Sequence, residues 1–137
     1  MGYEILDHTA DFGVRIYGKT LDELFQSGFT AVRDAMVEIK EKGEKLSEII
    51  FKEEGETLED LLVSFLSEVI FHTIVYGRVF IDCQLEVKEH SINAKLLYED
   101  FNPSKHRLKK EIKSVTYHNL QIKQTPEGYE ATIICDV

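Results

Sequence analysis

The feature of this sequence that most limits its fold is the segment 56–77, which is apolar around most of a helical turn. It reads ETLEDLLVSFLSEVIFHTIVYG, and its Leu, Phe, Val and Ile residues recur at the three- and four-residue spacing of an α-helix. Thr57 is placed to cap the first turn and Gly77 to end the helix. A helix with so wide an apolar arc belongs in the interior, so we expect it to be the central helix, packed against a sheet.

A second helix is predicted within residues 19–39, KTLDELFQSGFTAVRDAMVEI. Thr20 occupies the N-cap position, and Glu23 three residues later completes a capping box. The apolar residues that share one stripe of this helix are Leu21, Leu24, Phe25, Val32, Ala35 and Met36. This stripe is typical of a helix that packs one face on a core.

Most of the remaining chain carries the two-residue alternation of β-strands. The predicted strands are 12–18, 46–53, 79–87, 91–99, 114–123 and 128–137. Strict alternation in the third puts Val79, Ile81, Cys83, Leu85 and Val87 on one face. Two hairpins are expected, 79–87 with 91–99 and, around TPEG, 114–123 with 128–137.

This order of elements predicts an α+β fold. We expect a single domain, residues 1–137, with two layers: two main helices packed on one face of a mixed or mostly antiparallel sheet. The chain begins without a basic and apolar leader, and its longest apolar runs are too short to span a membrane. The chain has only two cysteines, Cys83 and Cys135, and neither belongs to a CxxC pair. Such a low cysteine content is typical of the reducing cytoplasm.

The charge of the chain is strongly acidic but uneven. The net charge is −9, which disfavours direct binding to a phosphate backbone. In contrast, residues 104–113, SKHRLKKEIK, carry five Lys or Arg and one Glu, a local charge of +4. Lys105 and His106 lie in a predicted loop there, where they could reach a partner's phosphate or carboxylate. The same lysines could equally protect an edge strand from unwanted pairing.

Oxygen ligands occur at both ends of the chain. Asp11 follows a polar turn before the first predicted strand, and Asp136 is the penultimate residue of the last one. Together with the carboxylate of Val137 they could hold Ca²⁺, Mg²⁺ or Mn²⁺. Alternatively, Asp11 caps a turn and the C-terminus is solvated. No zinc spacing, nucleophile elbow or phosphate-binding loop is present, so the sequence carries no self-sufficient catalytic signature.

Several separated stretches together resemble the archease family. They are DHTADFGVRIYG, SKHRLKKEIKSVTYHNL, the terminal ICDV, and the two helical segments TLDELFQSGFTAVRDAM and TLEDLLVSFLSEVIF. The resemblance covers nearly the whole chain in the same order, and Phe12 is a conservative departure from the smaller aliphatic residue usual after HTAD.

The resemblance implies an accessory protein, not an enzyme, that activates the RtcB-type RNA ligase of tRNA splicing by promoting guanylylation and multiple turnover. It implies a divalent cation, often calcium, bound by Asp11, Asp136 and an oxygen of Val137, with Asp7 and His8 as supporting neighbours. It further implies that Lys105 and His106 act on the ligase. Two other functions remain open: a small metal-dependent phosphoester hydrolase, and a chaperone-like or nucleic-acid-binding module.

Overall fold

The computed structural model describes residues 1–6 and 11–137, and in this part of the chain every strand pairing is antiparallel. The largest sheet has the order β1-β2-β10-β8, and β9 also pairs with β10. Its strands are β1 (Gly2–Leu6), β2 (Phe12–Gly18), β8 (Ser114–Thr116), β9 (Lys123–Thr125) and β10 (Gly128–Asp136). The strands near the two ends of the chain are therefore neighbours.

The other strands form two smaller sheets. A three-stranded sheet has the order β4-β6-β5, with β4 (Ser47–Glu54), β5 (Arg78–Lys88) and β6 (Ser91–Asp100). A two-stranded sheet pairs β3 (Val37–Ile39) with β7 (His106–Leu108). The sequence suggested one sheet, whereas the structure distributes the strands over three.

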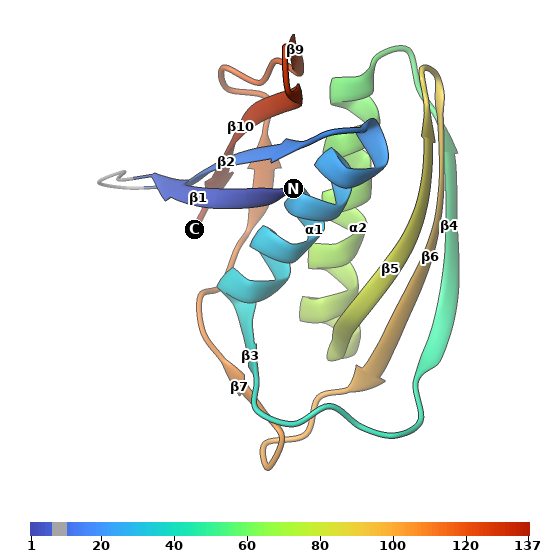
Figure 1. The fold of residues 1–137 in the computed structure, drawn as a ribbon. Coiled ribbons are helices and arrows are strands. Elements are labelled where there is room, and N and C mark those ends of the chain that lie inside the picture. The colour runs from blue at the N-terminus through green and yellow to red at the C-terminus, as the bar shows by residue number, and fades with distance from the viewer. Residues whose placement is uncertain (7–10) are drawn as a thin grey trace.

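The two helices, α1 (Leu21–Met36) and α2 (Leu58–Tyr76), lie between the five-stranded and the three-stranded sheet (Figure 1). α1 packs against β2 on one side, β5 on the other and α2 beside it. The predicted class, two helices packed on antiparallel strands in an α+β fold, is confirmed. Neither helix is long and apolar enough to cross a membrane.

Both helix starts form as the sequence predicts. The Thr20 hydroxyl accepts a hydrogen bond from the Glu23 amide at 3.1 Å, and the Thr57 hydroxyl accepts one from the Asp60 amide at 3.0 Å. Gly77 ends α2 with a left-handed backbone, φ 64°, a conformation that glycine adopts without a steric penalty. These caps satisfy backbone groups that a helix end would otherwise leave unpaired.

Two strand predictions need correction. Val79 and Phe80 are both buried, because a register shift between Phe80 and Asp82 breaks the strict alternation predicted for 79–87. Arg33 of α1 occupies this irregularity: its Nη1 donates to the carbonyl oxygens of Phe80 and Ile81, both at 2.9 Å. The predicted strand 114–123 is divided into β8 and β9, separated by a turn in which Asn119 has φ 54°.

The core is continuous across the layers. It joins β2, α1 and α2 to β5 and β6, and its largest fully buried side chains include Phe25, Phe29, Phe65 and Phe80. The rings of Phe25 and Phe29 both lie 6.4 Å from that of Phe65, within the range of favourable aromatic packing. The apolar faces of both helices thus hold the sheets in fixed positions around the candidate site.

Candidate functional site

The pairing of β2 with β10 brings the two predicted aspartates to one end of neighbouring strands. The last matched pair in this register is Phe12 with Cys135. Asp11 immediately precedes Phe12, and Asp136 immediately follows Cys135. Both aspartates are exposed. Although they are far apart in sequence, the antiparallel ladder makes them neighbours.

The outer faces of these two strands coincide. Arg15 of β2 donates from Nη2 to Glu130 Oε2 of β10 at 2.8 Å. Because side chains alternate along a strand, Asp136 shares its face with Glu130, whereas Asp11 lies in a bend just before β2. The end of the ladder thus brings the two aspartates close along the backbone.

Asp136 is also held from its other side by β8. Its carbonyl oxygen accepts a hydrogen bond from the Lys113 amide at 2.8 Å, and its Oδ2 accepts one from the Ser114 hydroxyl at 3.2 Å. Val137 follows directly and is 38% exposed. The two carboxylates and an oxygen of Val137 could offer an oxygen-only donor set, which is the kind that a hard cation such as Ca²⁺, Mg²⁺ or Mn²⁺ prefers.

A thiolate ligand is not available beside these oxygens. Cys135 is buried, and burial, reinforced by the negative charge of Asp136, raises the pKa of its thiol to about 12. The thiol therefore stays protonated at neutral pH. Within residues 1–6 and 11–137, no three His, Cys, Asp or Glu side chains converge as a complete metal site.

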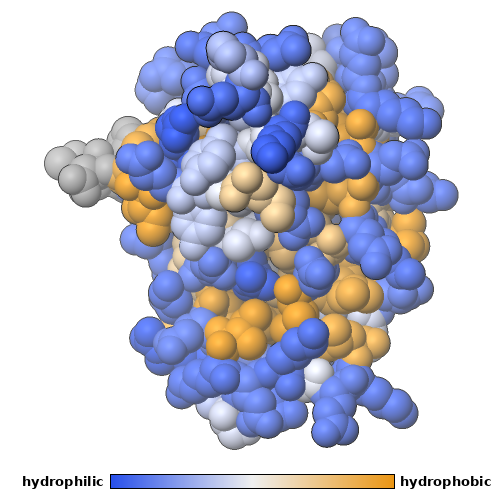
Figure 2. Space-filling model, viewed as in Figure 1, coloured by the Kyte–Doolittle hydropathy of each residue, from blue (hydrophilic) through white to orange (hydrophobic). Residues whose placement is uncertain are grey.

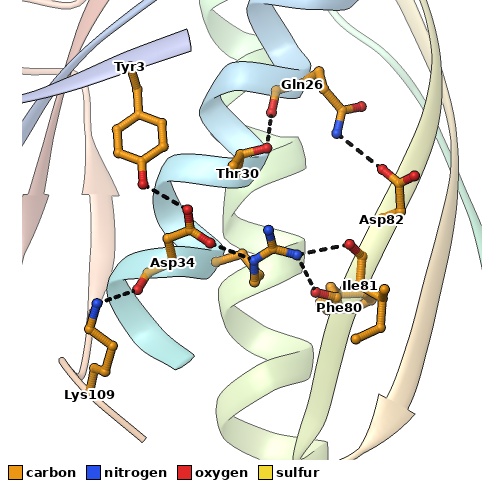
Figure 3. A network of polar contacts seen from close by, with 9 residues as sticks. Tyr3, Gln26, Thr30, Asp34, Phe80, Ile81, Asp82 and Lys109 are labelled. Carbon is orange, nitrogen blue, oxygen red and sulfur yellow. Dashed lines mark hydrogen bonds and ion pairs between the residues drawn. The ribbon is translucent and has the colours of Figure 1, made fainter. Parts of the chain in front are cut away.

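Asp11 also lines a cavity of 640 Å³ between β1, α1 and the segment after β7. Asp34 of α1 lines this cavity and is the centre of a hydrogen-bond network (Figure 3). Its carboxylate accepts hydrogen bonds from the Tyr3 hydroxyl at 2.7 Å and from Arg33 Nε at 2.8 Å, and its carbonyl oxygen accepts one from Lys109 Nζ at 2.9 Å. Burial, then the bond to Asp34, raises the pKa of Tyr3 to about 12.

His106 is buried, in contrast to the exposed loop position expected from the sequence. Only 1% of the residue is exposed. The Asn102 amide donates to its Nδ1 at 3.0 Å, so the proton lies on Nε2, which donates to Glu99 Oε1 at 2.6 Å. Glu99 Oε2 accepts a further hydrogen bond from the Gly43 amide at 2.7 Å. Both ring nitrogens are thus occupied within the chain.

Lys105 is half-buried, and its backbone fixes the neighbouring connection. Its carbonyl oxygen accepts hydrogen bonds from the Lys40 and Glu41 amides, at 2.8 and 3.2 Å. The structure does not join Lys105 and His106 to the aspartates in one sheet: β7 pairs with β3, and in Figure 1 it lies well below the C-terminus. The segment 108–113 connects the two regions.

The sequence did not predict two carboxylates of this region, Glu99, which bonds His106, and Asp34, which bonds Tyr3. Glu99 ends a regular strand pattern and Asp34 lies on a helix, so neither has a local signal; only the long-range contacts identify them. Asp7 and His8, which the sequence suggested as supporting neighbours of a cation, lie outside the described residues.

Comparison with known proteins identifies the family. Residues 3–137 match the model of the Archease protein family (MTH1598/TM1083). Protein archease of Pyrococcus furiosus is 38% identical, with 98% of each chain covered. The corresponding protein of Methanosarcina barkeri is 36% identical, covering 98% of this chain and 95% of the relative.

Two solved structures share the fold. The solution structure of protein 1598 from Methanobacterium thermoautotrophicum has a TM-score of 0.75 at 23% identity and covers 99% of both chains. An archease of Thermotoga maritima, described as a possible chaperone, has a TM-score of 0.65 at 19% identity, with 96% of this chain and 94% of that one covered. The match over nearly the whole sequence and the identities of the relatives show that this chain belongs to the archease family.

Proposed function

We propose that this protein is an accessory activator of an RtcB-type RNA ligase in the cytoplasm. It promotes guanylylation of the ligase and allows multiple turnover, and it does not join RNA itself. Membership of the archease family and the motifs around Asp11, Lys105 and Asp136 support this function. The acidic net charge of −9 favours a protein partner over a bare phosphate backbone.

We further propose that the protein binds a divalent cation. Calcium is the first candidate, and magnesium and manganese are the alternatives. Asp11, Asp136 and an oxygen of Val137 would hold it. The observation that supports this assignment is the β2–β10 register, which ends at Phe12 and Cys135, the residues next to Asp11 and Asp136. A bound cation would supply a fixed positive charge at an otherwise acidic end of the sheet.

Lys105 and His106 have different roles in this proposal. Lys105 is the residue that contacts the ligase, as a point charge on a flexible stem. His106 positions it, because the buried ring fixes the turn through Asn102 and Glu99. Substitution of His106 would then impair activation indirectly, through displacement of Lys105.

The direct test is multiple-turnover RNA ligation by a cognate RtcB-type ligase, with and without this protein. We expect a large increase in turnover, together with faster formation of the guanylylated ligase. Equal rates in both reactions would refute the activator function. Turnover of a phosphoester by the purified protein with Mn²⁺, lost in Asp11→Asn, would instead identify a hydrolase.

The cation site is tested separately by thermal unfolding with added Ca²⁺, Mg²⁺ or Mn²⁺. We expect Asp11→Asn and Asp136→Asn each to abolish the cation-dependent rise in Tm and the activation. Glu86→Gln, at an exposed carboxylate on β5, is the matched control and should keep both. A Tm rise in both aspartate variants equal to that of the unaltered protein would exclude these residues as ligands.

A further inference from the structure

The C-terminal end of α2 exposes an unusual amount of apolar surface. Phe71, Ile74, Val75 and Tyr76 are 48%, 47%, 56% and 56% exposed. Phe71, Ile74 and Val75 lie at the i, i+3 and i+4 positions of one helix face. The wide apolar arc of this helix is therefore only partly used by the core, which takes its N-terminal and middle turns.

Leu108 at the end of β7 extends this surface. It is 63% exposed, and it lines a groove of 290 Å³ together with Met36 and Ile74. We call Phe71, Ile74, Val75, Tyr76 and Leu108 the apolar patch. Figure 2 shows hydrophobic side chains gathered in the lower half of the molecule, where Figure 1 places the end of α2 between β7 and β5. A contiguous apolar surface of this kind marks an interaction site.

The exposed position of Leu108 is rigid. Leu108 is paired with Val37 in the β3–β7 ladder. The next two amides, of Lys109 and Lys110, donate to the carbonyl oxygens of Met36 and Ala35 at 2.8 and 3.0 Å. The apolar side chain is thus presented to solvent on a backbone that is already ordered, which lowers the entropic cost of binding.

The charge beside the patch indicates the partner. Lys109, Lys110 and one acid, Glu111, line the same groove. Lys109 also has a structural role, because its Nζ donates to the Asp34 carbonyl near the C-terminal end of α1, where a cation is favourable. Lys110 is exposed and forms no side-chain hydrogen bond or ion pair among the described residues. It lies between this groove and the cavity beside Asp11, with its Nζ 6.0 Å from the centre of the Phe12 ring. This lysine can therefore pair with an acid of a partner.

Two other occupants fit these observations less well. In a symmetric dimer through the patch, two copies that each carry a net charge of −9 would meet, and a net charge far from zero disfavours self-association. RNA would meet an apolar surface with few cations on a protein of net charge −9. We propose that the apolar patch and Lys110 bind an acidic, apolar surface of a partner protein, which, on the basis of the proposed function, is the RNA ligase.

The test measures the affinity of the full-length protein for a cognate RtcB-type ligase by calorimetry. The variants are Ile74→Ser with Leu108→Ser, and separately Lys110→Glu. The matched controls lie on other strands: Ile50→Ser, at a residue 55% exposed on β4, and Lys123→Glu, at an exposed lysine on β9. All five proteins should unfold at similar temperatures, because the altered side chains are on the surface.

We expect the double serine variant and Lys110→Glu each to raise Kd at least tenfold. We expect the effect of Lys110→Glu to shrink at high salt and the controls to bind as the unaltered protein does. Binding and activation by the unaltered protein with no change in either variant would overturn this inference alone. Absence of any binding or activation by the unaltered protein would overturn the proposed function and, with it, this one.

Size-exclusion chromatography with light scattering and an RNA titration test the other occupants. A monomer that does not bind RNA supports the inference. A dimer that dissociates in the double serine variant would assign the patch to a second copy. Salt-sensitive RNA binding that is lost in Lys110→Glu would assign it to RNA. Either of these results would overturn the proposal.

Discussion

Replacement of His106 by alanine tests whether this residue is a structural anchor or a contact with the ligase. The ring is buried, accepts the Asn102 amide at 3.0 Å and donates to Glu99 at 2.6 Å. Its removal leaves the Asn102 amide unpaired, at about 1–3 kcal/mol, and opens a cavity beside the Phe101 ring, whose centre lies 5.9 Å away. Glu99 Oε1 also loses its donor, while Oε2 keeps the bond from Gly43. The total loss in the free energy of unfolding is roughly 3–5 kcal/mol.

A loss of that size lowers Tm by roughly 10–20 °C for a chain of this length. The assay is urea unfolding followed by circular dichroism, with Lys105→Ala as the neighbouring control. We expect the control to lose less than about 1 kcal/mol and still to fail in ligase activation. A double-mutant cycle with Glu99→Gln should give a coupling energy of about 1 kcal/mol or more.

Unfolding of His106→Ala at the same urea concentration as the unaltered protein would contradict a structural role for this ring. Should that stable variant also lose activation, the ring itself would be the contact with the ligase. A coupling energy near zero between His106 and Glu99 would show that the short contact contributes nothing to stability.

Three further predictions concern the rest of the fold. Burial and the bond to Asp34 raise the pKa of Tyr3 from 10.0 to about 12, so the stability that the neutral hydroxyl contributes is fully present below pH 10 and is lost as the pH rises through 12. Tyr3→Phe should flatten this alkaline loss in pH-dependent unfolding, and an unchanged profile would contradict the assignment. Arg33→Met should cost roughly 2–4 kcal/mol, because the carbonyl oxygens of Phe80 and Ile81 at the β5 irregularity lose their donor. A cost below about 1 kcal/mol in urea unfolding would be inconsistent with this role. Cys83 and Cys135 are buried and burial raises the pKa of both thiols, so a thiol reagent at pH 8 should label them only on unfolding; rapid labelling of the native protein would disprove their burial.

The local parts of the fold could be predicted because their causes are close together in sequence. Thr20 and Thr57 each cap the amide three residues later, and Gly77 supplies the left-handed turn that ends α2. The turn between β9 and β10 also forms where Pro126 and Gly128 predict it. The irregularity in β5 was not predictable in this way, because the Arg33 guanidinium that occupies it is far away in the sequence.

The candidate site was likewise only partly predictable from the sequence. The sequence identified Asp11, Asp136 and Lys105 as charged groups in notable positions, but it could not reveal that the ring of His106 faces Glu99 inside the protein. Burial of a polar residue depends on a partner, and partners from distant segments leave no local pattern.

The sequence by itself determined the helices, their caps, the hairpin turns and the family, since each rests on residues within a few positions or on motifs in a fixed order. Only the tertiary structure decided that β2 lies beside β10, that α1 and α2 separate two sheets, and that the end of α2 remains uncovered. The physical reason is that hydrogen bonds within a turn or helix are selected locally. The pairing of distant strands and the burial of an apolar face are instead selected by the packing of the whole chain.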